Sequence, residues 1–422
     1  MTEPRAALST SKQFAAPLTL LFIAILINYV DRGNLSIAAP LLKDELGISA
    51  SQLGFLLSAF FWSYTAMQFV SGWLVDRFDA SVVIAAGYFV WSLATSATGF
   101  VHGFAMLALM RLLLGLGESV AFPCCSKLLA LHLPETSRGF ANGVIISAIR
   151  CGPAVGTFGA GLLMARFGWR AVFIGIGFAS LLWLPAWVRW MPCRRESLAA
   201  GSRDIATAID ILHQRSFWGA SAGHFCGNYL LYFLVTWLPF YLVHERHLTM
   251  EGMSRIAAAY FLIDAASAMF TGWFSDRLIR SGRTATVVRK GAMAVGYSTA
   301  AVALAMCGIS NASSYFPWLI AAGFGSGMGG SGTFAFAQTL AGSHAAGRWS
   351  GMQNGFGNFA GIIGPALTGY IVEWTGNFQG AFAITAAVSL TGALAWTFGV
   401  GRLEPIRWGQ QTVLQVRASS SA

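Results

Sequence analysis

Long apolar runs alternate with short polar connections along the whole chain. A run of about 20 residues crosses the apolar core of a bilayer as a helix. Because that core offers no hydrogen-bond partner to an open backbone, such runs must be helical. The pattern predicts an all-α membrane protein with twelve transmembrane helices. The runs are residues 16–39, 52–75, 82–101, 104–131, 140–163, 171–191, 216–243, 254–275, 289–309, 315–341, 349–373 and 380–400.

One longer polar interruption divides the runs into two sets of six. Between Met191 and Ser216 the chain is charged and contains Pro and Gly. We therefore predict a six-helix bundle at 1–191, a cytoplasmic linker at 192–215, and a second six-helix bundle with a cytoplasmic tail at 216–422.

Short motifs repeat between the two sets. Gly72-Trp-Leu-Val-Asp76-Arg77 ends the second run, and Gly272-Trp-Phe-Ser-Asp276-Arg277 ends the eighth. Asn142-Gly143 precedes Gly152-Pro153-Ala154 at the spacing at which Asn354-Gly355 precedes Gly364-Pro365-Ala366. The repeats predict two pseudo-symmetric halves. Parallel six-helix repeats are typical of one large transporter fold, in which the substrate site lies between the halves.

Composition narrows the class of protein. Of the 422 residues, 55% are hydrophobic and 10% are charged, against roughly 25% charged residues in an average soluble domain. Mean hydropathy is +0.60. So few polar residues cannot cover a water-soluble fold, which excludes a soluble enzyme, a disordered protein and a nucleic-acid binder.

The net charge of +10 is distributed unevenly over the loops. With the N-terminus in the cytoplasm, 18 of the 27 Lys and Arg residues fall on the cytoplasmic side and five on the outer side. Cytoplasmic loops of membrane proteins carry this excess of basic residues. The bias predicts a multi-pass protein of the plasma membrane, in bacteria the inner membrane, with both termini cytoplasmic.

Charged side chains lie inside several predicted helices, where each costs about 2.5–3.5 kcal/mol on insertion scales, and four of them form two pairs. The first run carries Asp31 and Arg32, and the fourth carries Arg111 and Glu118. Seven residues, or two turns, separate Arg111 from Glu118, so they share a face. Gly115 between them leaves room for a ligand or for a neighbouring helix.

Two interpretations of these charges stay open. In the first they form buried ion pairs, such as Asp31 with Arg111, that only hold helices together. In the second the arginines bind an anion, because a guanidinium donates two parallel hydrogen bonds to a carboxylate. Burial favours a neutral carboxyl and a nearby Arg favours its charged form. An anion that competes for the Arg would therefore release the acid to bind a proton.

Two motifs resemble signatures of the major facilitator superfamily. They are the Gly72…Asp76-Arg77 loop and Arg111-x3-Gly115-x-Gly117-x5-Pro123. Three further segments are similar to the anion:cation symporter family of that superfamily. They are Asn28-Tyr-Val-Asp-Arg-Gly-Asn34, Gly115-Leu-Gly-Glu118 and Tyr232-x4-Trp237-Leu-Pro239-x-Tyr241. The resemblance covers nearly the whole chain.

The resemblance implies proton- or sodium-driven movement of organic anions. It implies that Asp31 and Glu118 are the protonatable pair and that Arg32 and Arg111 are the buried basic residues. Other expected roles are cavity-lining positions at Tyr29, Tyr64 and Asn358, and conformational-switch loops at Asp76-Arg77 and Asp276-Arg277.

The sequence departs from the superfamily pattern at two places. Asp79-Ala80-Ser81 replaces the usual Gly and basic residues after Arg77, which predicts a weaker conformational latch. Arg150 stands in helix five, where small or apolar residues are common. Arg150 and Asp264 each lie twelve residues, about 18 Å, from the cytoplasmic edge. We predict an ion pair that links the halves; the alternative is two unrelated charges, each facing its own polar pocket.

Other features add little chemistry. The six cysteines lack metal-ligand spacing, so no metal is expected. His224 in the seventh run is a weak candidate for a proton relay. The aromatic residues Phe60, Phe61 and Trp62 favour helix packing and lipid contact. The Gly-rich tenth run has no Walker lysine, so it indicates close helix packing and no nucleotide.

The sequence as a whole predicts a secondary transporter that works by alternating access and imports a small organic carboxylate, a sugar acid or an aromatic acid, with protons. We expect a monomer without cofactor or catalytic activity. The expected substrate-binding residues are Tyr29, Arg32, Tyr64, Arg111 and Asn358, and the proton-coupling residues are Asp31 and Glu118. Two alternatives remain: a proton-independent exchanger of organic anions, and a membrane sensor that binds anions without moving them.

Overall fold

The computed structural model describes residues 14–132, 135–191, 207–311, 314–406 and 408. These residues are helical with short connections, and no strand occurs among them. The helices are α2 (Ala15–Leu46), α3 (Ala50–Arg77), α4 (Ala80–Thr98), α5 (Phe104–Glu118), α6 (Ala121–His132), α7 (Glu135–Leu181), α8 (Trp183–Trp190), α9 (Ala208–Leu212), α10 (Arg215–His244), α11 (Met250–Arg280), α12 (Ala285–Ile309), α13 (Tyr315–Gly330), α14 (Thr333–Thr375), α15 (Gln379–Leu394) and the π-helix η1 (Ala395–Gly399).

The predicted runs fall on these helices with shifted boundaries. The fifth and sixth runs share α7, which bends at Gly168, where φ is 76°. The fourth run breaks between α5 and α6, and the tenth breaks between α13 and α14. In the described part of the chain, nine stretches are long and apolar enough to cross a membrane, and the 44-residue stretch Ser147–Trp190 holds two runs. The expected connection at 342–348 is helical, because α14 continues through it.

The helices divide into two compact units. Unit 1 comprises Met1–Glu196, Tyr232–Leu262 and Gly361–Ala381, and unit 2 comprises Ser197–Leu231, Ile263–Ala360 and Phe382–Ala422. Unit 1 therefore contains the helices before the linker together with parts of α10, α11 and α14 and the start of α15.

Within unit 1, α3 and α14 approach each other closely at the start of α3. A Cβ atom at Gly54 would lie 2.6 Å from the carbonyl oxygen of Pro365 and 3.1 Å from the Cα atom of Gly369. The backbone N–H of Ser51 donates to the Glu373 carboxylate at 2.7 Å. This close packing explains why part of α14 belongs to unit 1, although it follows the linker in sequence.

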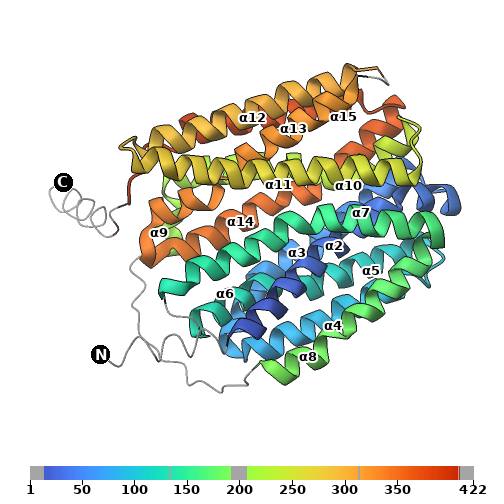
Figure 1. The fold of residues 1–422 in the computed structure, drawn as a ribbon, viewed down its shortest axis with the longest axis horizontal. Helices are drawn as coiled ribbons and strands as arrows, with labels where there is room; N and C mark the ends of the chain where they lie inside the picture. Colours follow the sequence, from blue (N-terminus) through green and yellow to red (C-terminus); the bar gives the residue numbers. More distant parts are fainter. Residues whose placement is uncertain (1–13, 133–134, 192–206, 312–313, 407, 409–422) are drawn as a thin grey trace, which may run out of the picture. The chain divides into compact units, whose positions relative to one another are not determined.

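Unit 2 contains the Gly-rich helix pair α12 and α13, which run side by side (Figure 1). A Cβ atom at Gly325 would lie 2.5 Å from the Ala300 backbone nitrogen and 2.7 Å from the Gly296 carbonyl oxygen. The glycines of the tenth run therefore permit close helix packing, as their sequence pattern predicts.

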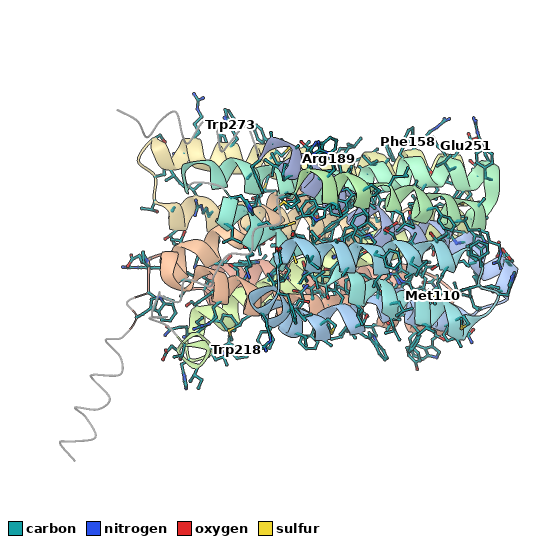
Figure 2. All side chains as sticks on the ribbon, turned by 90° about the horizontal axis from the view of Figure 1, so that it is seen from below. Met110, Phe158, Arg189, Trp218, Glu251 and Trp273 are labelled. Atoms are coloured by element: carbon teal, nitrogen blue, oxygen red, sulfur yellow. The ribbon has the colours of Figure 1, made fainter. Side chains whose placement is uncertain are left out.

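Large apolar side chains also lie on the surface of both units. Phe158, Trp218 and Trp273 are each about half exposed (Figure 2). Exposed apolar side chains along such helices suit contact with lipid, since the bilayer core is itself apolar.

Candidate functional site

A buried ion pair joins α2 and α5 within unit 1. The Nε atom of Arg32 on α2 lies 2.8 Å from Oε2 of Glu118, the last residue of α5. The Arg32 side chain is 7% exposed and that of Glu118 is 0% exposed. A buried pair is stable only when its geometry and added hydrogen bonds offset the loss of water. The predicted binding and proton-coupling residues Arg32 and Glu118 are therefore in direct contact.

Two glycines beside Glu118 let α5 approach its neighbours. A Cβ atom at Gly115 would lie 3.1 Å from the Tyr64 backbone nitrogen on α3. A Cβ atom at Gly117 would lie 2.8 Å from the Gly87 carbonyl oxygen on α4. Of the two uses that the sequence leaves open for Gly115, the structure therefore shows the neighbouring helix.

Aromatic rings surround the Arg32 guanidinium. Its Cζ atom lies 4.6 Å from the ring centre of Tyr29, 4.4 Å from that of Tyr64 and 5.1 Å from that of Phe60. The guanidinium of Arg111 lies 5.1 Å from the same Phe60 ring. Cation–π contacts of this kind stabilise a buried guanidinium. Tyr29 and Tyr64 thus contact Arg32, and Arg111 shares the Phe60 ring with it, while the binding roles of these residues stay predictions. Phe60, interpreted from the sequence as a packing residue, contacts both arginines.

Asp31 lies beside this pair but has a different partner. Its side chain is 1% exposed, and Oδ1 accepts a hydrogen bond from Asn34 Nδ2 at 3.1 Å. Among the described residues no ion pair joins Asp31 to Arg111, so that pairing, one example of the structural interpretation, is wrong. The reason is geometric: Arg32 comes within contact of Glu118, and neighbouring Asn34 supplies a partner for Asp31 on the same helix.

Several buried polar atoms of this cluster have no hydrogen-bond partner among the residues that the structure describes. Within the described part of the chain they are Asp31 Oδ2, Arg32 Nη2, Arg111 Nε, Glu118 Oε1 and both amide atoms of Asn28. Each unpartnered buried polar atom costs about 1–3 kcal/mol. Such a concentration is unusual in a folded protein, so the cluster has capacity to bind a polar molecule.

Tyr232 of α10 is another aromatic residue of unit 1, although it follows the linker in sequence. Its ring lies 4.3 Å from that of Phe61, and its phenol is within electrostatic range of Arg32. Sequence reasoning used Tyr232 only as part of a family motif. The motif was the available signal, but it did not show that the side chain lies near Arg32.

Comparison with known proteins now identifies the family. The Major Facilitator Superfamily model matches residues 21–288 and 253–419. The chain belongs to the major facilitator superfamily. A chain of this superfamily is a membrane transporter and not an enzyme.

Relatives of this superfamily member carry acids according to their names. The hexuronate transporter of Bacillus subtilis (strain 168) is 30% identical over 399 residues, which are 91% of this chain and 94% of that protein. The probable galactarate/D-glucarate transporter GarP of Escherichia coli (strain K12) is 29% identical over 421 residues, with 92% and 94% covered. The probable sulfoacetate transporter SauU of Cupriavidus necator is 30% identical over 389 residues, with 88% and 90% covered.

A solved structure supports the fold. The superfamily member matches a bacterial homologue of the human lysosomal transporter Spinster, in an inward-facing and unoccupied conformation, with a TM-score of 0.72. The two chains are 17% identical, and the match covers 91% of this chain and 94% of that one. The predicted major facilitator fold is therefore confirmed.

The loop motifs of this superfamily member are only partly described. Arg77 and Arg277 are exposed, and the Arg277 guanidinium lies 5.7 Å from the Trp273 ring centre. The side chains of Asp76 and Asp276 lie outside the described residues. The switch role of these four residues stays a prediction.

Asp79, one of the departures from the superfamily pattern, has a definite structural role. Its carboxylate accepts hydrogen bonds from the backbone N–H and the hydroxyl of Ser81, both at 2.7 Å, and so caps the start of α4. Nearby, the Lys127 ammonium of α6 donates to the carbonyl oxygen of Val75. A basic residue of α6 therefore reaches the end of α3, close to the segment in which Asp79-Ala80-Ser81 replaces the usual basic residues.

The remaining predicted residues lie in separate places. Asn358 is buried in unit 2 and donates to the Asn354 carbonyl oxygen at 2.8 Å. Asp264 on α11 is buried in the same unit. The side chain of Arg150 lies outside the described residues, so the Arg150–Asp264 ion pair stays a prediction.

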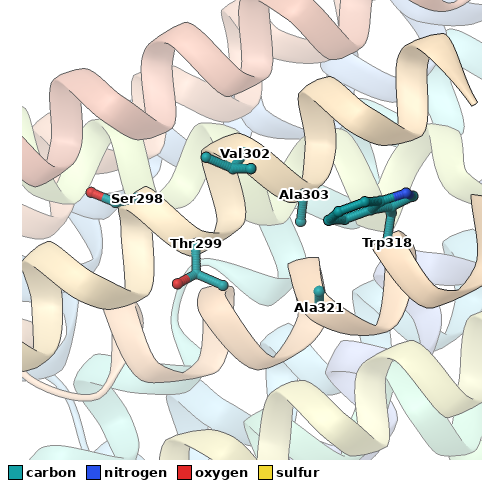
Figure 3. Close-up of a pocket in the computed structure, with 6 residues that line it drawn as sticks. All are labelled: Ser298, Thr299, Val302, Ala303, Trp318 and Ala321. Atoms are coloured by element: carbon teal, nitrogen blue, oxygen red, sulfur yellow. The ribbon is translucent and has the colours of Figure 1, made fainter.

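A hollow between α12 and α13 lacks the chemistry of an anion site. Its lining residues are Ser298, Thr299, Val302, Ala303, Trp318 and Ala321 (Figure 3). None of them carries a charge, and the four buried charged residues of α2 and α5 belong to unit 1. The charged cluster, and not this hollow, is the candidate binding site.

Proposed function

We propose that this transporter imports a small organic carboxylate, a sugar acid or an aromatic acid, together with protons. The names of the relatives support an acid, and hexuronate, galactarate and glucarate favour the sugar acids. We also propose that the protein works as a monomer by alternating access. Its expected place is the bacterial inner membrane with both termini cytoplasmic.

The observation that carries this proposal is the Arg32–Glu118 pair. It is buried and lies against aromatic rings, and among the described residues Arg32 Nη2 and Glu118 Oε1 have no hydrogen-bond partner. A carboxylate from the substrate can take the place of Glu118 on Arg32, because a guanidinium prefers a two-point contact with a carboxylate. Arg111, which contacts the same Phe60 ring, offers a second positive charge.

Displacement of Glu118 then couples the anion to a proton. While Glu118 contacts Arg32, the positive charge stabilises its ionised form. When the substrate occupies Arg32, Glu118 is a buried carboxylate without its partner, which is costly. Protonation of Glu118 removes that cost, so anion and proton are bound together. Asp31 lies close enough to Glu118 for the two carboxyl groups to interact electrostatically, so Asp31 can share the role of proton carrier.

Uptake into proteoliposomes tests the proposal. Vesicles with the purified protein receive an inward proton gradient and labelled sugar acids, aromatic acids or dicarboxylates. We expect one class to accumulate, and a protonophore to abolish the accumulation. Exchange without accumulation would contradict proton coupling and favour the exchanger, and binding without saturable flux would favour the sensor.

The variant Glu118→Gln separates the proton step from substrate movement. Gln keeps the size of the side chain but neither ionises nor takes up a proton. We expect accumulation against a gradient to vanish while preloaded vesicles still exchange substrate. Accumulation by Glu118→Gln equal to that of the wild type would show that Glu118 is not the proton carrier.

A further inference from the structure

The side chain of Asn28 is a buried amide next to the Arg32–Glu118 pair. It is 0% exposed, and in the part of the chain that the structure describes neither its oxygen nor its nitrogen has a hydrogen-bond partner. Asn28 precedes Arg32 by one turn of α2, so the two side chains share a face. The amide also interacts with the Glu118 carboxyl group, although not in a fully formed hydrogen bond. Glu118 is therefore within reach of two polar groups of α2, a guanidinium and an amide.

The two carboxyl oxygens of Glu118 differ in their partners. Oε2 accepts a hydrogen bond from Arg32 Nε at 2.8 Å. Oε1 has no partner among the described residues. Because the side chain is 0% exposed, bulk water does not freely replace the missing partner. The carboxyl group is thus bound on one side only, and the amide of Asn28 is next to it.

The chemistry of an amide fits a protonated carboxyl group better than an ionised one. A protonated carboxyl group has one O–H donor and one carbonyl acceptor, and a primary amide has an acceptor oxygen and an NH2 donor. Glu118 O–H can therefore donate to Asn28 Oδ1 while Asn28 Nδ2 donates to the Glu118 carbonyl oxygen. An ionised carboxylate only accepts, so it leaves Asn28 Oδ1 without a donor. Arg32, which only donates, suits the ionised form.

The charged and titratable groups around the pair come from five helices. They are Tyr29 and Asp31 on α2, Tyr64 on α3, Tyr88 on α4, Arg111 on α5 and Tyr232 on α10. The charges of Arg111 and Asp31 act on Glu118 in opposite directions. Neither charged group combines a donor with an acceptor, as the Asn28 amide does.

We propose that Asn28 is a positioning residue for proton coupling, which holds the protonated Glu118 carboxyl group in two hydrogen bonds while the carried acid occupies Arg32. A proton from the aqueous phase forms the O–H bond on Glu118, and the carboxyl group turns from Arg32 to Asn28. The part that concerns the acid rests on the proposed function. The pairing of Asn28 with protonated Glu118 does not, because it requires only the proton.

Infrared difference spectroscopy of the full-length protein in vesicles tests the pairing without transport. The pH is lowered from about 8 to about 4, a range that covers ordinary and perturbed carboxyl groups. The C=O band of a protonated carboxyl group that is absent in Glu118→Gln is assigned to Glu118. We expect this band to move to higher frequency in Asn28→Leu, because its carbonyl loses a hydrogen-bond donor. An identical band in Asn28→Leu, or a Glu118 that never takes up a proton, would overturn the proposal.

The pH profile of uptake tests the role in coupling. Asn28→Leu keeps the approximate shape of the side chain and removes two unpartnered polar atoms, so we expect the variant to fold without loss of melting temperature. The labelled probes are galactarate and a hexuronate, the acids named for two relatives. We expect the profile of Asn28→Leu to move about one pH unit toward acid, the effect of one or two lost neutral hydrogen bonds to the protonated form.

Three further variants complete the test. Asn28→Ala removes the same two atoms and gives a second measurement of the shift, whereas Asn28→Gln keeps the amide and should stay closer to the wild-type profile. Thr368→Val on α14 is the matched control, since it removes another hydroxyl that is buried and has no described partner, and its profile should not move.

Two outcomes separate this proposal from the proposed function. If folded Asn28→Leu has the wild-type pH profile, or only a raised KM at every pH, Asn28 has no part in proton coupling while the transport of the acid stands. If neither acid is transported by the wild type, the proposed function fails, and the infrared band still decides whether Asn28 pairs with protonated Glu118.

Discussion

The two units bury different kinds of polar side chain. In unit 1, Arg32, Glu118, Asp31 and Arg111 are buried together on α2 and α5. In unit 2, the described polar contacts of α10 and α14 involve an amide, an indole and His224, and the buried Asp264 lies apart on α11. Buried charged side chains can bind a carboxylate or a proton, whereas neutral hydrogen-bond donors can bind hydroxyl oxygens. The difference predicts that substitutions of the charged residues in unit 1 affect the transport of every acid, and that a neutral residue of unit 2 such as Asn358 affects only acids with hydroxyl groups.

Loss of Arg32 should have the largest effect. Arg32→Ala removes one partner of a buried ion pair and leaves Glu118 uncompensated, a change of about 3–5 kcal/mol. We expect uptake of every acid to fall about 100-fold or more, measured as initial rates in proteoliposomes. Arg32→Lys, which keeps the charge without the planar fork, should be intermediate.

The matched control for Arg32 is Arg255→Ala. Arg255 is 70% exposed and pairs with Glu251 one turn away, so the Arg255→Ala variant should transport acids at the normal rate. If Arg32→Ala reduced the uptake of hydroxylated acids only, the comparison would be wrong. Arg32 would then select among acids and would not bind the carboxylate that all of them share.

Substitution of Phe60 should impair transport less than substitution of Arg32, and should impair it equally for all acids. Phe60→Leu keeps an apolar side chain and removes the ring that both guanidinium groups contact. Cation–π contacts contribute about 0.5–2 kcal/mol, so we expect KM to rise about 2–30-fold. Phe89→Leu, at an exposed position of α4, is the control. An unchanged KM in Phe60→Leu would mean that Phe60 only packs, as its sequence pattern indicated.

Asn358 should affect only acids with hydroxyl groups. Asn358→Ala removes a buried amide from the neutral side of the comparison, and one neutral hydrogen bond contributes about 0.5–1.5 kcal/mol. We expect KM for a sugar acid to rise about 2–10-fold and KM for an acid without hydroxyls to stay constant. Asn311→Ala, at an exposed position, should change neither. An equal rise for both acids would place Asn358 in carboxylate binding.

Asp79 should change stability alone. Asp79→Ala removes the cap at the start of α4, which costs about 1 kcal/mol. We expect a lower melting temperature in detergent with normal KM and pH dependence, and no change in Asp44→Ala, whose side chain is exposed. A loss of uptake larger than the loss of folded protein would assign Asp79 to the conformational cycle.

The helices were predictable because the bilayer imposes their length and apolar composition. The boundaries were not, because breaks such as Gly168 and the continuous helix through 342–348 depend on packing and backbone angles. The residues Arg32, Glu118 and Arg111 were predictable as site candidates, since charge inside an apolar run is rare and costly. Tyr29 and Tyr64 were candidates only through the family resemblance. Their pairing was not, because sequence spacing relates positions on one helix only.

The sequence by itself therefore determined the membrane fold, the family and the charged residues of the candidate site. Only the tertiary structure decided that Glu118 and not Asp31 contacts an arginine, that Phe60 serves both guanidinium groups, and that the Asn28 amide lies next to Glu118. The physical reason is that these features depend on different distances along the chain. Hydropathy and helical period act along one segment, whereas ion pairs and hydrogen-bond directions depend on side chains that distant segments bring within about 3 Å.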